Sequence, residues 1–368
     1  MKRLVTSLLV SAAFGASASG GTSERPLIMQ PEISPDGTQI AFSYQGDIWT
    51  MSTSGTNPNR LTIHEGYESS PKWSKDGSSI AFSSDRFGND DVFVMPSEGG
   101  RPDRLTYHSA PDRVLGFSND NQVLFNTRRL YAEVEREWEV YGVAPTGDAT
   151  ESRYMDALGF DAMVSPDGTK IAFVRSTARV SREDYRGPAN RNIWIYDTET
   201  SEYEQLTDFD GNDFMPKWSS NNELYFISAR AGKYNVFKQK LGSKRAIQVT
   251  DESEFGVEHF SIDKQANHLV YQAADKVKLI ADGQSSSLDL SIPTDFRFDP
   301  VTKKSTTDSL DEYSVSPDGK LISYVVRGDL FVKRNDKEDK RSVRLTTGAA
   351  RDRDVTWLDD NTLPFVSD

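Results

Sequence analysis

The 368-residue chain contains no cysteine, and this absence excludes both a disulfide framework and a thiolate metal site. The chain also lacks the G-x-S-x-G, H-E-x-x-H, P-loop, G-x-G-x-x-G and D-x-[DN]-x-[DN]-G sequences that would indicate a nucleophile, a metal or a nucleotide. We therefore expect no catalytic residue, no metal and no cofactor in this chain. Its few histidines are interpreted as satisfied or solvated loop residues: His64, His108, His259 and His268.

The chain also has fewer basic than acidic residues. Lys and Arg number 43 against 56 Asp and Glu, and the formal net charge is −13. Nucleic acids and anionic membrane surfaces attract a surplus of Lys and Arg, so neither is expected as a partner. A hydrophobic fraction of 36% and a charged fraction of 27% are typical of a soluble globular protein. Peptide and protein partners remain compatible with this composition.

The long apolar stretch of the chain lies at its N-terminus. Lys2 and Arg3 precede an uncharged run from Leu4 to Ala16, and Ala16-Ser17-Ala18 fits a cleavage site. Residues 1–18 are therefore predicted to be a signal peptide, and the product is expected to be periplasmic or secreted. No cysteine follows the cut, so a lipoprotein anchor is excluded. A buried N-terminal helix is the alternative interpretation.

A short pattern, Ser-x-Asp-Gly, recurs along the chain. In such a turn Asp hydrogen-bonds to its own backbone and Gly takes the positive φ. A repeat near forty residues that contains only strand-like segments is typical of four-stranded propeller blades. Successive copies are 40 to 55 residues apart, with clear copies at Ser34, Ser74, Ser165 and Ser316 and weaker ones at Ser118, Ser219 and Ser261.

Two further segments follow each turn. A strand with alternating apolar residues, such as Ile40 and Phe42, would bury one face between blades. A third strand then starts with Asp or Asn, as in Asp47-Ile48-Trp49, and the unit closes on a triplet such as Arg60-Leu61-Thr62. We predict an all-β fold, a six-bladed β-propeller followed by the truncated start of a second β-propeller.

The repeat divides the chain into regions. After the signal peptide, residues 27–292 are predicted to be the six-bladed propeller, 293–307 a linker without the pattern, and 308–368 the first one and a half blades of the second propeller. One ring of seven or eight blades is the alternative. We prefer the break because the longest interval precedes Ser316. Blades need neighbours on both faces, so a chain that stops in mid-blade is expected to be a fragment of a longer protein.

Two charged insertions interrupt the repeat between the second and third strands of neighbouring blades. One runs from Arg128 to Glu137 and the other from Arg175 to Arg191. Loops of the same type emerge on the same face of a propeller, so the two insertions should stand side by side. They are interpreted either as solvated loops or as a contact for an anion, a carboxylate or another domain.

Residues 327–368 carry a more specific pattern. It reads Arg327-Gly328-Asp329-Leu330-Phe331, then Arg344-Leu345-Thr346-Thr347-Gly348, then Arg351 to Trp357, and finally Phe365-Val366-Ser367-Asp368. This order resembles the opening of the second propeller of tricorn-like serine peptidases. The earlier blades are similar to that family's first propeller and, more loosely, to TolB-type propellers with WD-like repeats.

The resemblance implies a peptidase that trims peptides from their C-termini and whose propellers gate and guide the substrate. A second propeller, a PDZ domain and the catalytic Ser, His and Glu would lie downstream, so no catalytic residue is assigned here; the parent could be homo-oligomeric. The family holds the substrate's C-terminus with two basic residues on a first-propeller loop, which implies substrate binding by Arg128 and Arg129. The family's founding members are cytoplasmic, in contrast to the signal peptide. The alternative function is a non-enzymatic TolB-type protein-binding propeller in the periplasm.

Overall fold

The computed structural model describes residues 5–9, 26–130, 137–176, 178–293, 310, 312–339, 341–348 and 350–368. All regular elements in these ranges are β-strands, and none of them holds a helix long and apolar enough to cross a membrane. The chain separates into two compact units, Ser23–Pro293 and Met1–Thr22 together with Thr294–Asp368. The linker predicted at 293–307 lies outside the described residues except for Pro293.

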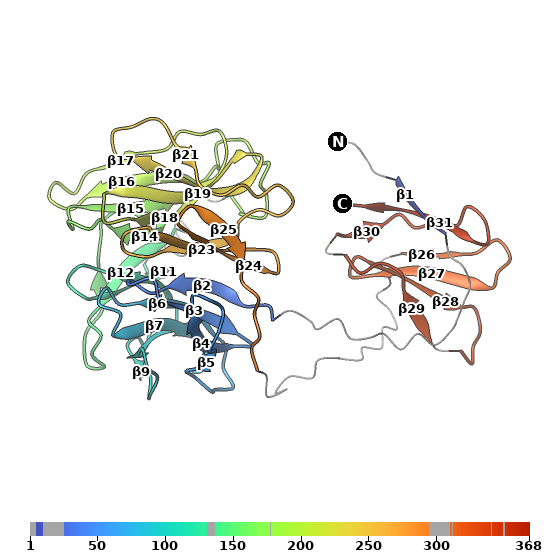
Figure 1. Ribbon diagram of the computed structural model, residues 1–368, viewed down its shortest axis with the longest axis horizontal. Coiled ribbons are helices and arrows are strands. Elements are labelled where there is room, and N and C mark those ends of the chain that lie inside the picture. The colour runs from blue at the N-terminus through green and yellow to red at the C-terminus, as the bar shows by residue number, and fades with distance from the viewer. Residues whose placement is uncertain are drawn as a thin grey trace. The chain divides into compact units, whose positions relative to one another are not determined.

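Six four-stranded antiparallel sheets follow one another in the larger unit (Figure 1). Each sheet consists of four consecutive strands, so the chain completes one sheet before it starts the next. Sheet 1 is β2–β5 (Met29–Ile33, Gln39–Tyr44, Asp47–Ser52, Asn59–Arg60), sheet 2 is β6–β9 (Glu68–Trp73, Ser79–Ser84, Asp91–Pro96, Asp103–Arg104), sheet 3 is β10–β13 (Arg113–Phe117, Val123–Thr127, Glu139–Val143, Ser152–Arg153), sheet 4 is β14–β17 (Phe160–Val164, Lys170–Arg175, Asn192–Asp197, Tyr203–Gln205), sheet 5 is β18–β21 (Asp213–Trp218, Glu223–Ala231, Lys233–Lys240, Ile247–Gln248) and sheet 6 is β22–β25 (His259–Ile262, His268–Ala273, Lys276–Ala281, Gln284–Ser287).

The six sheets close into a ring. Each sheet contacts the next through its first strand, and β22 and β23 of sheet 6 contact β2 of sheet 1. No described strand is shared between these two sheets, and side-chain packing together with a few hydrogen bonds closes the ring. Phe42 and Ile28 pack with Val270 and Val277 at this seam, and the Ile33 N–H donates to Ser261 Oγ at 3.2 Å. The all-β propeller that the repeat predicted is confirmed.

The Ser-x-Asp-Gly pattern forms the turn between the first two strands of a sheet. Ser34 Oγ donates to Asp36 at 2.5 Å and accepts the Gln39 N–H at 3.0 Å. Gly37 has φ of 75°, which a residue with a Cβ rarely adopts. The same pair of hydrogen bonds recurs in the other clear copies, which begin at Ser74, Ser165 and Ser316.

The alignment of the weak copy at Ser261 is wrong by two residues. Asp263 takes the place of the serine, because its backbone N–H donates to His268 O at 3.1 Å and the positive φ of 58° falls on Ala266. The Asp263 carboxylate accepts the N–H groups of Gln265 and Asn267, both at 3.0 Å. In this turn the single Asp263 side chain accepts the hydrogen bonds that a serine and an aspartate share in the other copies.

The closing Arg-Leu-Thr triplet compensates for very short fourth strands. Thr62 Oγ1 accepts the N–H of Ile48 at 2.8 Å, at the start of the third strand. Arg60 pairs with Asp47 at 2.6 Å in the same place. The threonine bond recurs in four more sheets at 2.8 to 3.0 Å, between Val92 and Thr106, Ile193 and Thr207, Val236 and Thr250, and Leu330 and Thr346.

The smaller unit has a four-stranded sheet, β26–β29, and a three-stranded sheet in the order β1-β31-β30. Its core packs Val325 and Leu330 against Trp357, Leu363 and Phe365. Strand β1 lies within the residues predicted to be a signal peptide, and the signal peptide stays a prediction. The strands are β26 Glu312–Val315, β27 Leu321–Val326, β28 Asp329–Arg334, β29 Ser342–Arg344, β1 Val5–Leu9, β30 Asp352–Arg353 and β31 Thr362–Ser367.

We expect Thr62→Val to lower the free energy of unfolding by about 1–3 kcal/mol, because the buried Ile48 N–H loses its acceptor. Urea unfolding measures the change. Thr56→Val, at an exposed position, is the control and should change stability by less than about 0.5 kcal/mol. An equal effect of the two substitutions would show that the threonine bond does not stabilise the sheet.

The turn aspartates should make the fold sensitive to acid. Hydrogen bonds from Ser74 and then from Ser78 lower the pKa of Asp76 to about 2, below its ordinary value near 3.8. The hydrogen bonds to the ionised aspartate therefore stabilise the fold above about pH 4, and this stabilisation is lost as the pH falls toward 2. The urea midpoint should decline across this range, and less steeply for Asp76→Asn. Identical pH slopes for the two proteins would contradict the prediction.

Candidate functional site

A cavity of about 750 Å³ lies at the end of the ring where the inner strands begin. The first strand of every sheet contributes to its wall, through Gln30, Ser70, Arg113, Asp161, Met215 and His259. Five of these strands carry a β-bulge at this point. Gln30, Ser70, Asp161 and Met215 have φ of 52° to 55° there. Bulges redirect side chains, and here the redirected side chains line the cavity.

Both charged insertions reach this cavity. Arg128 and Glu137 come from the insertion of sheet 3, Trp138 directly follows it, and Arg179 and Arg191 come from the insertion of sheet 4. The two insertions therefore stand beside one another, as their positions in the repeat predicted. Residues 131–136 and 177 of these insertions lie outside the described residues.

The cavity wall is rich in positive charge although the chain is acidic. Two acidic side chains, Glu137 and Asp161, face six basic ones. Guanidinium groups bind carboxylates through paired hydrogen bonds, and a concave wall of one charge concentrates ions of the opposite charge. The arrangement suits an anionic ligand. The six basic residues are Lys72, Arg113, Arg128, Arg179, Arg191 and Lys217.

Arg128 is free to meet such a ligand. Its side chain is exposed, and its guanidinium carbon lies 4.1 Å from the centre of the Trp138 ring. Among the described residues it has no ion-pair partner. The ring stacking orients the guanidinium group while its N–H donors stay available.

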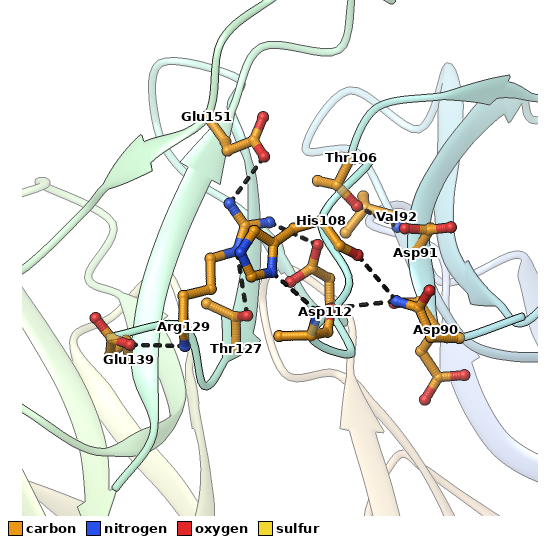
Figure 2. Close-up of polar contacts among 12 residues, drawn as sticks. Asp90, Asp91, Val92, Thr106, His108, Asp112, Thr127, Arg129, Glu139 and Glu151 are labelled. Carbon is orange, nitrogen blue, oxygen red and sulfur yellow. Dashed lines mark hydrogen bonds and ion pairs between the residues drawn. The ribbon is translucent and has the colours of Figure 1, made fainter. Parts of the chain in front are cut away.

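Arg129 is bound on all sides instead (Figure 2). Its Nη2 lies 2.7 Å from Asp112 Oδ2, its Nη1 lies 2.8 Å from Glu151 Oε1, and its Nε donates to Thr127 Oγ1 at 3.3 Å. Its backbone N–H donates to Glu139 Oε2 at 3.0 Å. The side chain is 9% exposed and does not belong to the residues that line the cavity.

The contacts of Arg129 recur in other sheets. Arg86 and Arg230 also lie two residues after a serine of a second strand, and their Nε atoms donate to Ser84 and Ser228 Oγ. Each pairs with an acidic residue at the start of the first strand, Glu68 for Arg86 and Asp213 for Arg230. A [Ser/Thr]-x-Arg pattern at 84–86, 127–129 and 228–230 is the sequence signal for this scaffold arginine. The two predicted substrate residues therefore have different environments, and their binding role stays a prediction.

A second charged group lies deeper in the ring. The Glu32 carboxylate of sheet 1 pairs with Lys72 of sheet 2 and lies 3.3 Å from Lys217 Nζ of sheet 5. Sheets 1 and 5 are not neighbours, because sheet 6 stands between them. The Glu32–Lys217 pair therefore crosses the centre of the ring. His259 of sheet 6 places its Nε2 3.7 Å from Glu32 Oε2, and Nε2 has no hydrogen-bond partner among the described residues.

Burial and charge set the ionisation of this group. Burial acts to raise the pKa of Glu32, but Lys217 and Lys72 outweigh it and hold that pKa well below its ordinary value. Burial lowers the pKa of Lys72 to about 8 and that of His259 to about 4. Burial also raises the pKa of Asp161, against the attraction of Arg191. At neutral pH Glu32 is thus ionised and His259 is neutral.

A smaller cavity of about 250 Å³ lies at the opposite end of the inner strands. It shares Met163 and Lys217 with the larger cavity. Glu32 lines the smaller cavity and Lys72 the larger one, so the Glu32–Lys72–Lys217 group lies between the two. The wall of the smaller cavity includes the turn residues Pro35, Ser74, Pro166, Ser220 and Lys264 and the indoles of Trp73 and Trp218.

Two histidines, His64 and His108, lie in loops as the sequence suggested, and His268 is the first residue of β23. His64 and His108 each accept a backbone N–H through Nδ1 at 2.9 Å, and His268 Nδ1 lies 2.7 Å from Asp263. His259 is different, because it lies on an inner strand beside the central charged group. No group of three His, Asp or Glu residues in the described ranges could hold a metal ion.

Sequence reasoning missed the central charged group. Its signal was the repeated triplets Pro71-Lys72-Trp73 and Pro216-Lys217-Trp218, which place a lysine on a strand that faces the ring centre. The sequence around Glu32 gave no comparable signal, because this acidic residue does not recur in a repeated triplet on the other inner strands.

Known proteins share this architecture. The chain is 26% identical to the Tricorn protease homolog of Saccharolobus solfataricus over 314 residues, 83% of this chain and 28% of that protein. It is 26% identical to Tricorn protease homolog 1 of Streptomyces coelicolor over 67% of this chain and 23% of that protein. The chain thus spans about a quarter of these relatives. The crystal structure of the tricorn protease superposes with a TM-score of 0.63 at 19% identity, over 93% of this chain and 33% of that one.

The family match covers most of the larger unit. Residues 25–286 match the family described as the Tricorn protease N-terminal beta propeller domain. With most of its length in that match, the chain belongs to the tricorn protease N-terminal β-propeller family.

Proposed function

We propose that this propeller binds the free C-terminal carboxylate of peptides in its basic cavity and so selects and guides substrates for a tricorn-like serine peptidase. The observation that carries the proposal is the excess of basic over acidic side chains in the wall of one cavity of an acidic chain. A carboxylate at a chain end is the anionic group that every unmodified peptide offers. The cavity volume of about 750 Å³ has room for several residues of a peptide end.

Arg128 is the proposed carboxylate ligand. It projects from the insertion of sheet 3, and Trp138 holds its guanidinium group in place by stacking. Arg179, from the insertion of sheet 4, is also exposed and lines the same wall. Two guanidinium groups from neighbouring sheets would hold a carboxylate more firmly than one. Arg129 contributes indirectly, because its ion pairs with Asp112 and Glu151 fix the start of the loop that carries Arg128.

Further parts of the proposal concern the whole protein. Relatives named as tricorn protease homologues are several times longer than this chain, which supports a parent with a second propeller, a PDZ domain and a peptidase region. Peptides would be its substrates, and a homo-oligomeric parent fits the same proposal. Lys2, Arg3 and the apolar run to Ala16 support a periplasmic or secreted location.

Arg128→Ala should weaken binding of a peptide with a free C-terminus by about tenfold, because a charged hydrogen-bond donor to its carboxylate is lost. Binding of the same peptide with an amidated C-terminus should change by less than about twofold. Fluorescence anisotropy of a labelled peptide measures both. Arg101→Ala, at an exposed position outside the cavity wall, is the matched control. Equal losses for the two peptides, or no loss for either, would contradict the proposed role.

Arg129→Ala should instead lower the free energy of unfolding by about 3–5 kcal/mol, because the fully buried Asp112 carboxylate loses its counter-ion. Arg128→Ala should change it by less than about 0.5 kcal/mol. Urea unfolding of both variants tests the contrast. Comparable stability losses for the two substitutions would refute the distinction between scaffold arginine and cavity arginine.

A further inference from the structure

We propose that Lys72, Lys217 and His259 form a carboxylate-binding site across the centre of the ring, which the chain's own Glu32 occupies in this structure. A carboxylate that enters the ring and replaces Glu32 would open the passage between the two cavities. The inference goes beyond the binding of peptide ends by Arg128 and does not depend on it.

Glu32 lies across the centre of the ring and blocks it. Its carboxylate reaches from sheet 1 to Lys72 on the neighbouring sheet and to Lys217 on sheet 5, on the far side of sheet 6. The larger cavity ends at Lys72 and Lys217, and the smaller one begins at Glu32 and Lys217. The two cavities share Lys217 and Met163, so they adjoin at the level of the ion pair. The pairing of Glu32 therefore separates them.

The site has binding capacity that Glu32 does not use. The side chains of Lys72 and Lys217 are 8% and 9% exposed, and Glu32 is the one ion-pair partner of both among the described residues. Two buried ammonium groups share one carboxylate, which leaves an excess of positive charge where charge is poorly solvated. His259 is 8% exposed, and its Nε2 makes no hydrogen bond beside the same carboxylate. The excess positive charge and the unbonded Nε2 of His259 favour an additional or exchanging anion.

A carboxylate between two lysines does not by itself make a ligand site. Glu223 on sheet 5 likewise pairs with two lysines, Lys238 with its Nζ at 3.3 Å and Lys240 with its Nζ at 3.9 Å. There both lysines are more exposed, at 32% and 73%, and all three residues belong to adjacent strands of one sheet. Neither cavity includes Glu223. It therefore provides a matched control.

The test uses the full chain with Arg128→Ala in the background, so that the proposed peptide ligand Arg128 does not bind the acetate. Acetate is titrated at pH 7 into protein labelled with ¹⁵N-histidine, in which His259 is one of four reporters. Glu32→Gln removes the internal competitor and keeps its shape, and should bind acetate at least about tenfold more tightly than the Glu32 protein. The shifts should be largest for His259. Glu223→Gln should bind acetate like the Glu32 protein.

A double variant, Glu32→Gln with Lys217→Met, keeps the net charge of the original group and should lose the gain in affinity. Lys217→Met with Glu32 intact covers the case in which Glu32→Gln fails to fold, and it should abolish the acetate-dependent shift of His259. The inference is overturned if Glu32→Gln binds acetate no more tightly. It is also overturned if the gain survives Lys217→Met, or if acetate moves only His64, His108 and His268. Loss of the Arg128-dependent peptide binding would leave these results unaffected.

Discussion

Each sheet of the ring is apolar on both faces and is stable only between two neighbours. Phe42, Phe82, Phe125, Phe173 and Phe226 hold the corresponding place on the second strand of sheets 1 to 5, and all are fully buried. This requirement makes the chain add sheets until the last one covers the first, with Ile28 and Val270 at the seam. Closure in turn brings six inner strands to one axis, and every site described above follows from that convergence.

The same convergence gives similar residues different roles. An arginine two residues after a Ser or Thr of the second strand meets the acid at the start of the first strand and becomes part of the scaffold, as Arg129 does with Asp112. Its neighbour Arg128 has no place in that repeated pattern and turns to the cavity, where it stacks on Trp138. Function in this propeller is therefore expected at the insertions that interrupt the repeat and at the charged residues of the inner strands.

The central Glu32 pair carries an energetic cost that an apolar filling would avoid. Burial disfavours the charged forms of Glu32 and Lys72, and their mutual attraction keeps Glu32 ionised. A buried ion pair contributes less to stability than well-packed apolar residues, so stability alone does not account for it. A reversible closure between the two cavities would account for the pair, because the carboxylate of Glu32 can be exchanged for the carboxylate of a ligand.

The sequence by itself determined the repeat and its local chemistry. Ser34, Asp36 and Gly37 form a turn for reasons that lie within six residues, and the Asp47, Arg60 and Thr62 motif closes a sheet within sixteen. Tertiary structure decided what those local rules leave open. Only the closed ring brings Glu32 to Lys217, 185 residues away, and only the packed sheet shows that Arg129 is bound while Arg128 is free. Period and turn chemistry are local, whereas the meeting of side chains at an axis depends on the closure of all six sheets.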